Sequence, residues 1–410
     1  MWRSLVVDVF EVLLARNAWE KRKWSQLVGI SKNMVDPTTG KYDSLIHIGP
    51  GNIRSNSREL VDLKTVKDEN LISGKFHFDK GDIIYGKINP QLAKYTIAPA
   101  EGLSSADTYV LKPKSGIERL FLYYTLGTNR FFKYTVSVSQ RTGMPKINRD
   151  ELNAYSLIIA PSLFEQKRIG LFLRKTDDLI AATQRRIDAL EQAKKALLQR
   201  LFDQSWRFKG YSDPWEKRKL GETNSYFTDG NYGESYPKES ELSDKENGVP
   251  FLRGSNLRNG ELIEDNANYI TKEKHAELTS GHLVEDDIVL AVRGSLGALG
   301  YVKDENIDWN INSQLAVIRT DKSELSGKFL VQFLLSWRGQ KELLSRNTGT
   351  ALKQLPIKQL KDVPVPIVNL DEQKEIGALF SSIDNLIAAT QSRLSSLELL
   401  KKSLLQDLFI

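Results

Sequence analysis

Two sets of polar side chains recur in loop-like stretches of this chain, and their types suit contact with the bases and phosphates of nucleic acid. The first set comprises Lys87, Asn89, Gln91, Lys94, Gln140, Arg141, Thr142 and Lys146. The second set comprises Arg253, Ser255, Asn256, Arg258, Arg293, Ser295, Arg346, Asn347, Thr348, Lys353 and Gln354. Arginine and lysine can donate to guanine, asparagine and glutamine can pair with adenine, and serine, threonine and lysine can hold phosphate. For any single residue a solvated surface loop is the better explanation, so the recurrence of the set carries the interpretation.

A threonine–glycine pair follows a helical stretch in each set. Thr142-Gly143 and Thr348-Gly349 stand where small residues and backbone N–H groups could approach a phosphate. The recurrence of this pair adds to the prediction that both sets bind DNA.

Motifs for catalysis are absent from the sequence. No phosphate-binding G-x-x-x-x-G-K-[S/T] loop is present, and Asn89-Pro90 is followed by Gln91 rather than by the Pro-aromatic pair of an amino-methyltransferase. Asp82 and Asp287 each start a buried strand, where we expect them to cap turns. We therefore predict no catalytic residue.

The four histidines and the absence of cysteine argue against a metal site. His47, His77, His275 and His282 form no H-E-x-x-H motif, and we expect them to form no cluster with carboxylates. The chain has no cysteine, which excludes disulfides and cysteine-ligated zinc. The sequence predicts no metal in this chain.

The elements that must position these loops are revealed by an internal repeat. Residues 165–202 and 372–409 align without a gap at a shift of about 207 residues, with about 22 of 38 positions identical. Apolar residues in both copies recur at alternating steps of three and four, which predicts two helices that pair with each other as a coiled coil. The predicted seam contains Leu173, Ile180, Ile187, Leu190, Leu197, Ile387, Leu394, Leu397 and Leu404.

Polar residues interrupt this seam at matching positions of the two copies. Thr183 corresponds to Thr390, and Lys194 corresponds to Lys401. Such residues weaken a coiled coil but fix its register and orientation. The alternative is that each helix packs only on its neighbouring globular region.

The repeat extends beyond the helices to the globular regions. Trp19-Glu-Lys-Arg-Lys recurs at Trp215, and each copy opens a region with strand and turn patterns, a helical stretch (116–138 and 327–344) and a final strand. Residues 221–248 read as a long polar loop, and residues 5–14 as a short helix or strand. We predict a mixed α+β fold with globular domains over 1–160 and 211–368, each followed by a long helix region, over 161–210 and 369–410.

Composition is typical of a soluble globular protein. The chain of 410 residues has 40% hydrophobic and 27% charged residues, a net charge of +6 and a pI near 9.1. The basic balance is a mild indication of a polyanionic partner. No apolar run is long enough to cross a membrane, and we expect a cytoplasmic location.

At these residues the chain resembles the DNA-specificity subunits of type I restriction–modification systems. The resemblance rests on the Trp-Glu-Lys-Arg-Lys-Leu start at Trp215, the Thr-Gly segments near the end of each globular region, the Glu-Gln pairs that open the long helices, and the shared Ile-Ala-Ala-Thr-Gln. It covers nearly the whole chain.

This resemblance implies a non-catalytic subunit with two target-recognition domains that read the halves of a split double-stranded DNA site, and with two long helices that pair as an antiparallel coiled coil. It also implies that two methyltransferase subunits bind the chain and that two nuclease-translocase (restriction) subunits can join. S-adenosylmethionine, ATP and Mg²⁺ would then belong to those partners, with no cofactor in this chain. The alternatives are an enzyme with degenerate motifs and a coiled-coil scaffold without DNA specificity.

Overall fold

The computed structural model describes residues 19–140, 143–349 and 353–409. These residues form two compact units: unit 1 holds the chain as far as Gln184 together with Ser392 onward, and unit 2 runs from Arg185 to Gln391. Each unit contains one globular head and half of each long helix. The predicted element over 5–14 lies outside the described residues.

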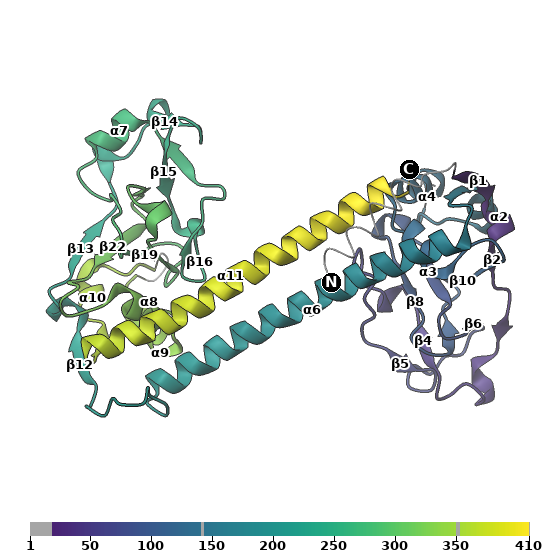
Figure 1. Ribbon diagram of the computed structural model, residues 1–410, viewed down its shortest axis with the longest axis horizontal. Helices are drawn as coiled ribbons and strands as arrows, with labels where there is room; N and C mark the ends of the chain where they lie inside the picture. Colours follow the sequence, from purple (N-terminus) through teal and green to yellow (C-terminus); the bar gives the residue numbers. More distant parts are fainter. Residues whose placement is uncertain (1–18, 141–142, 350–352, 410) are drawn as a thin grey trace. The chain divides into compact units, whose positions relative to one another are not determined.

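Two sheets build the head of unit 1 (Figure 1). An antiparallel sheet has the order β2-β10-β7-β8, formed by β2 (Val28–Ile30), β7 (Ile83–Gly86), β8 (Tyr95–Ile97) and β10 (Thr108–Pro113). A second sheet has the order β3-β6-β9-β4-β5, formed by β3 (Met34–Val35), β4 (Ile46–Ile48), β5 (Lys64–Thr65), β6 (Lys75–Phe78) and β9 (Gly102–Ser104). Strands β4 and β9 are parallel. The pair of β1 (Glu20–Lys23) with β11 (Ser156–Ile159) joins the start of the head to its end.

The helices of this head are α2 (Trp24–Leu27), α3 (Arg119–Thr125), α4 (Asn129–Ser139) and α5 (Arg149–Ala154). The helical stretch predicted over 116–138 is thus two helices rather than one. The break occurs because the Thr128 side chain accepts a hydrogen bond from the Phe131 N–H and caps a new helix. Phe121, Tyr124 and Phe131 then reach the buried core against Trp24 and the sheet.

The head of unit 2 repeats this plan. Its antiparallel sheet has the order β13-β22-β19-β20, formed by β13 (Tyr226–Asp229), β19 (Ile288–Ala291), β20 (Leu299–Tyr301) and β22 (Leu315–Arg319). Its second sheet has the order β14-β18-β15-β21, formed by β14 (Leu242–Ser243), β15 (Val249–Leu252), β18 (Asn268–Ile270) and β21 (Asn310–Ile311), with β15 and β21 parallel. The small pairs are β12 (Glu216–Lys219) with β23 (Pro364–Ile367) and β16 (Leu257–Arg258) with β17 (Glu261–Leu262).

Residues 221–248 are not the continuous loop that the sequence predicts. They contain β13, which pairs with β22 at the edge of the central sheet, and β14, which pairs with β18. The helices of this head are α7 (Lys272–Glu277), α8 (Gly327–Leu335), α9 (Trp337–Ser345) and α10 (Ile357–Lys361). The mixed α+β class is confirmed, and the central antiparallel sheets of the two heads have the same strand order, while the second sheets have five strands in one head and four in the other.

The two long helices are α6 (Leu163–Phe202) and α11 (Leu370–Asp407). Within the described residues, every predicted seam position is buried or half-buried, with Leu173, Ile187 and Leu397 among the most buried. The apolar face that periodicity predicts is therefore the face of each helix that is buried in the structure.

Within each unit the helix halves run in opposite directions. In unit 1 Asp177 of α6 pairs with Lys401 of α11, and the Phe409 ring lies 5.0 Å from Phe121 of α3, against which Gly170 packs. A Cβ atom at Gly170 would lie only 2.6 Å from Leu120 Cβ, so this close approach requires glycine. Lower residue numbers in α6 therefore lie beside higher residue numbers in α11, which means that the two helices are antiparallel in this unit.

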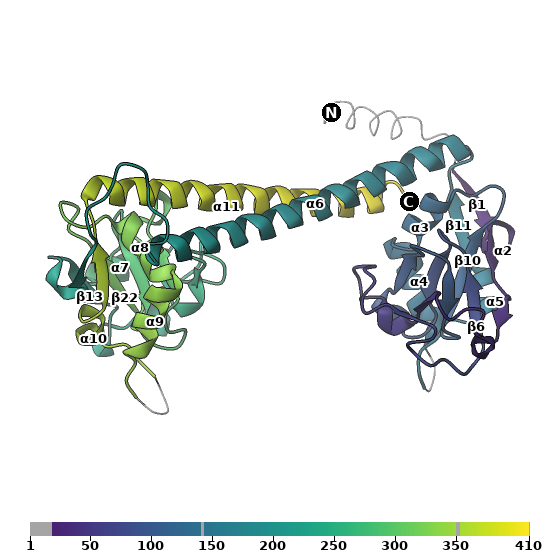
Figure 2. The same ribbon diagram turned by 90° about the horizontal axis from the view of Figure 1, so that it is seen from below.

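The same contacts recur in unit 2 with the copies exchanged. Lys194 of α6 pairs with Asp384 of α11 (Nζ–Oδ1 2.6 Å). Gly377 packs on Lys328 and Phe329 of α8, and the Phe202 ring lies 5.9 Å from Phe329. Figure 2 shows α8 beside this part of α11.

The polar seam residues divide into two kinds. Thr183 and Thr390 donate their hydroxyls to carbonyls of their own helices, Leu179 O (2.7 Å) and Leu386 O (2.6 Å). Each seam lysine instead forms an ion pair with an aspartate of the other long helix. The lysine–aspartate pairs therefore fix the register, as predicted for the lysines, while the threonine hydroxyls hydrogen-bond only within their own helix.

A buried glutamine at the start of each long helix ties that helix to its head. Gln166 accepts from the Glu118 N–H (2.8 Å) and donates to the carbonyls of Ala160 (2.8 Å) and Gly116 (3.1 Å). Gln373 makes the equivalent three bonds, to Ser326 N–H, Val368 O and Glu324 O. Both side chains are fully buried. The Glu-Gln motif is thus a structural joint.

Among the described helices, none combines the length and the apolar character that crossing a bilayer requires.

Candidate nucleic-acid interface

In the first head, the two predicted polar segments lie side by side. The Asn89 N–H donates to Pro145 O (2.7 Å), the Ile147 N–H donates to Lys87 O (2.9 Å), and Ile88 forms a bridge with Lys146. Residues 87–94 and 143–147 therefore form one surface, although about fifty residues separate them in the sequence.

The side chains of this surface differ in what they already contact. Lys87 Nζ lies 5.7 Å from the centre of the Tyr109 ring, and Lys94 Nζ donates to Pro50 O (2.6 Å), next to the turn that follows β4. Gln91, Gln140 and Lys146 are exposed. Arg141 and Thr142 lie outside the described residues.

In the second head, Arg293 is the centre of the equivalent surface. Its Nε donates to Gln354 Oε1 (3.2 Å), and its backbone forms a bridge with Gln354. The backbones of Thr348 and Gln354 exchange hydrogen bonds of 2.8 and 2.9 Å, which places these two residues side by side. The structure thus joins Arg293 to Gln354 and Thr348, as it joins 87–94 to 143–147 in the first head.

Tyr232 belongs to this surface, and the sequence analysis missed it. Arg293 Nη1 donates to the Tyr232 hydroxyl (2.7 Å) and its guanidinium lies 5.1 Å from the ring centre, while the hydroxyl donates to Asp229 (2.8 Å). Burial raises the pKa of the Tyr232 phenol, so the hydroxyl keeps its proton at neutral pH. An aromatic residue within a polar stretch was the available signal in the sequence.

The Arg253 turn lies beside the Arg293 loop. Gly254 faces Ser295, because a Cβ atom on Gly254 would lie 3.4 Å from the Ser295 side chain. Arg253 donates to Asn266 O (2.9 Å) and leaves a buried Nε without a partner. Ser255 and Lys353 are exposed beside these groups.

Asn256 is a structural residue, and its prediction as a DNA-binding residue is wrong. It is fully buried, its Oδ1 accepts from the Arg253 N–H, and its Nδ2 donates to the carbonyls of Ile263 and Asp265. Asn52 makes the same bonds in the first head, to Gly49 N–H, Val61 O and Asp62 O. The repeated asparagine therefore holds a turn in both heads, which leaves no amide edge for a base.

The remaining candidates lie apart from the Arg293 contacts. Arg258 lines a cavity of about 750 Å³ together with Glu191 and Lys194 of α6. Arg346 Nη1 donates to Glu342 of the preceding turn of α9 (2.6 Å), and Asn347 Oδ1 is buried without a partner. Contact of any of these residues with DNA stays a prediction.

Asp82 and Asp287 cap turns, as predicted. Asp82 accepts from the Asp79 N–H and Asp287 accepts from the Val284 N–H, each at 2.9 Å. Each also pairs with a cation of the central strand, Lys112 (3.0 Å) in the first head and Arg319 (2.8 Å) in the second. The hydrogen bond to Asp287 raises the pKa of Arg319.

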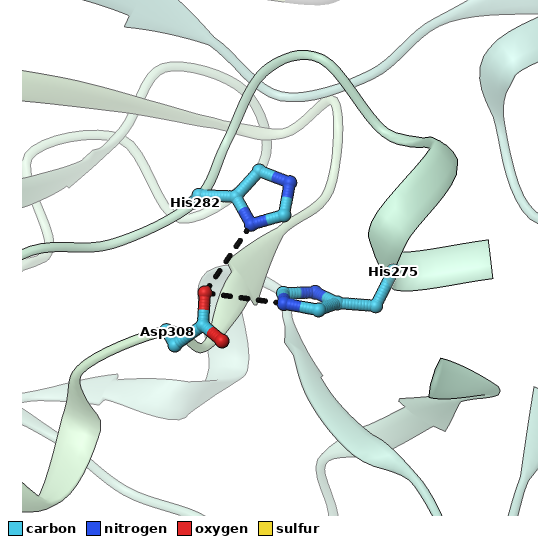
Figure 3. Close-up of side chains that lie close together, drawn as sticks. All are labelled: His275, His282 and Asp308. Atoms are coloured by element: carbon cyan, nitrogen blue, oxygen red, sulfur yellow. Dashed lines mark hydrogen bonds and ion pairs between the residues drawn. The ribbon is translucent and has the colours of Figure 1, made fainter. Parts of the chain in front are cut away.

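The prediction that the histidines form no cluster with carboxylates is wrong for two of them. His275, His282 and Asp308 converge in the second head, with potential ligand atoms all within 4.8 Å of one another (Figure 3). His275 and Asp308 are 33 residues apart in the sequence, so local spacing could not reveal the cluster.

The family model that matches this chain is the type I restriction modification DNA specificity domain, over residues 17–192 and again over 212–399. The type I restriction enzyme MjaVIII specificity subunit of Methanocaldococcus jannaschii is 26% identical over 74% of this chain and 73% of its own length. The EcoDI specificity subunit of Escherichia coli is 33% identical over 40% of this chain and 35% of its own length.

Among solved structures, a type I restriction–modification S subunit from M. genitalium has a TM-score of 0.64 with this chain, at 18% identity over 97% of both chains. At this identity the likeness shows the fold.

Proposed function

Because this chain belongs to the family of type I restriction–modification DNA specificity subunits, we propose that it reads a split double-stranded DNA target, one part with each head. The observation that carries this proposal is the repeated assembly of two polar loops into one surface in each head. The two surfaces occupy equivalent places but differ in residues, since Lys87 and Lys146 lie in one and Arg293 and Gln354 in the other. Different side chains at equivalent places suit different half-sites.

The similarity of the two long helices, with about 22 of 38 positions identical, supports a scaffold for two copies of one partner. A duplicated chain imitates a two-fold dimer, and a repeated surface can bind a repeated subunit. We propose two methyltransferase subunits on this scaffold, with two nuclease-translocase subunits able to join them. On this view the chain itself performs no catalysis, and S-adenosylmethionine, ATP and Mg²⁺ belong to those partners.

The decisive experiment is co-expression of the chain with a candidate methyltransferase subunit, followed by single-molecule sequencing of host DNA for methylated adenine. We expect a two-part motif with a fixed unspecific gap. Replacing residues 19–159 with the equivalent head of a relative should change one half of the motif and leave the other half intact.

Two variants sharpen this test, Lys146→Ala in the first head and Arg293→Ala in the second. Each should weaken methylation of the split site by about fivefold or more if a base or phosphate contact is lost, and a lost base contact should relax the sequence only in the half that its own head reads. Absence of any motif, despite a stable complex with the methyltransferase, would refute DNA specificity and leave a scaffold function.

A further inference from the structure

Three side chains of the second head surround a point that could hold one cation (Figure 3). His275 Nε2 lies 3.2 Å from Asp308 Oδ1, and His282 Nδ1 lies 3.4 Å from the same oxygen. The two imidazole rings are 4.3 Å apart between centres. Both histidines thus direct one ring nitrogen toward a single carboxylate oxygen.

The backbone fixes the tautomer of His282. Its Nε2 lies 2.7 Å from Leu278 O, and a carbonyl oxygen can only accept, so Nε2 carries the proton. In the neutral ring, Nδ1 is then a lone pair that faces the Asp308 carboxylate. Two acceptors facing each other at this distance need a positive charge between them. In metal-binding histidines, the ring nitrogen that does not bind the metal usually donates a hydrogen bond to a group such as a backbone carbonyl.

The separations of the two histidine nitrogens from the Asp308 oxygen fit a small transition-metal ion. Ligands of one tetrahedral zinc lie about 3.3 Å apart, since each bond is about 2.0–2.1 Å long. The two measured separations from Asp308 bracket this value. Two imidazoles and one carboxylate are ligands that suit zinc-type ions rather than Mg²⁺ or Ca²⁺, which prefer oxygen alone.

The surrounding backbone holds the three ligands without needing the ion. Thr271 caps α7, which carries His275. The Leu283 N–H donates to Trp309 O (2.9 Å) and the Asp308 N–H donates to Leu283 O (2.8 Å), which joins the loop of His282 to that of Asp308. The Asp308 side chain is 73% exposed, so an ion can enter and water can occupy a fourth position.

The first head provides a natural comparison. His77 occupies the place of His282, five residues before the turn-capping aspartate in both heads. His77 Nε2 contacts Glu101 (2.7 Å), which immediately precedes β9 as Asp308 precedes β21. Among the described residues, no second histidine joins the His77–Glu101 pair.

We propose that His275, His282 and Asp308 bind one divalent transition-metal ion of the zinc type, which ties α7 to the loop before β21. The ion supports the second head only, because the first head has a single histidine and a carboxylate at the equivalent place. Its role is structural, since it holds α7 and the loop before β21 together beside the sheet that contains β15. Strand β15 leads directly to Arg253.

The test uses the full-length chain without a histidine tag, stripped of metal by a chelator. Titration with Zn²⁺ against a chromophoric competitor should show one saturable site per chain, and Co²⁺ should give the visible absorption of a four- or five-coordinate nitrogen–oxygen site. Zn²⁺ should also raise the melting temperature. The Co²⁺ spectrum needs no variant, so it remains informative if a variant folds poorly.

Asp308→Asn and His282→Ala should each weaken Zn²⁺ binding at least about tenfold. Asparagine is chosen because Asp308 has φ +64, a conformation that asparagine tolerates. The matched control is His77→Ala, which should retain the site. Absence of saturable binding, equal binding in Asp308→Asn, or loss of the site in His77→Ala would each overturn the proposal. Absence of binding would mean that a proton on His282, rather than a metal, balances Asp308.

Discussion

Single residues that are identical between the two copies have structural roles in this chain. Gln166 and Gln373 make the same three hydrogen bonds, and Asn52 and Asn256 hold the same turn. The sequence predicted Asn256 as a DNA-binding residue because amide type alone does not reveal burial. Comparison with Asn52 would have corrected it, since a residue that both heads keep cannot explain their difference.

Replacing Gln166 with alanine should destabilise the protein by about 2–4 kcal/mol. The change leaves the Glu118 N–H and two carbonyls buried without partners, and each such group costs about 1–3 kcal/mol, although water entering the cavity recovers part of this. Chemical denaturation of the full chain measures the effect. Gln192→Ala on the exposed face of the same helix is the control and should change stability by less than about 0.5 kcal/mol. Equal stability of the two variants would contradict the assigned role of Gln166.

The metal-ligand cluster marks the limit of prediction from residues. His275, His282 and Asp308 meet only because the backbone joins Leu283 to Trp309, which is a long-range pairing. Nothing in the local spacing of these residues encodes that pairing.

At the scale of elements, strong periodicity predicted structure well and weak patterns did not. The alternating three- and four-residue steps identified α6 and α11 and their buried face, because a long amphipathic helix is stable only when its apolar stripe is covered. Strand β13 was missed because it is short, lies at a sheet edge and shares its stretch with polar turns. The break between α3 and α4 depended on one capping side chain, Thr128.

The seam of the helices should depend measurably on its lysine–aspartate pairs. A double-mutant cycle with Lys194→Ala and Asp384→Ala should give a coupling energy of about 1–2 kcal/mol, because the two side chains are only 13% and 26% exposed. The matched control is Arg174–Asp178 on α6, whose side chains are 52% and 68% exposed and should couple by less than about 0.5 kcal/mol. Equal coupling in the two cycles would show that the seam pair is no more than a surface contact.

At the scale of the whole molecule, the sequence repeat predicted two heads and two helices, and the structure shows central sheets with the same strand order in both heads. What the repeat could not predict is which loops meet. The joining of 87–94 to 143–147, and of Arg293 to Gln354, depends on hydrogen bonds and backbone bridges between distant segments. The candidate surfaces were therefore predicted as separate loops rather than as assembled faces.

Inserting one heptad into each long helix should change the gap in the DNA target and not its half-sites. A heptad adds about 10 Å of helix, which corresponds to about three base pairs of B-DNA. Duplicating residues 178–184 and 385–391 keeps the two copies matched. A methylation map of this variant should show the original half-sites with a longer gap, and changed half-sites with an unchanged gap would contradict it. Insertion in α6 alone serves as the control, since it shifts one seam against the other and should abolish methylation.

The crossed lysine–aspartate pairs have a consequence for the gene as well as for the protein. Each helix carries one aspartate and one lysine of these ion pairs, Asp177 and Lys194 in α6 and Asp384 and Lys401 in α11. A gene product that ended after α6 would therefore contain both members of this ion pair, so that two copies of it could pair with each other. If the proposed function holds, such a truncation would replace a reader of two different half-sites with a self-paired reader of an inverted repeat. Its target would then be set by a single head.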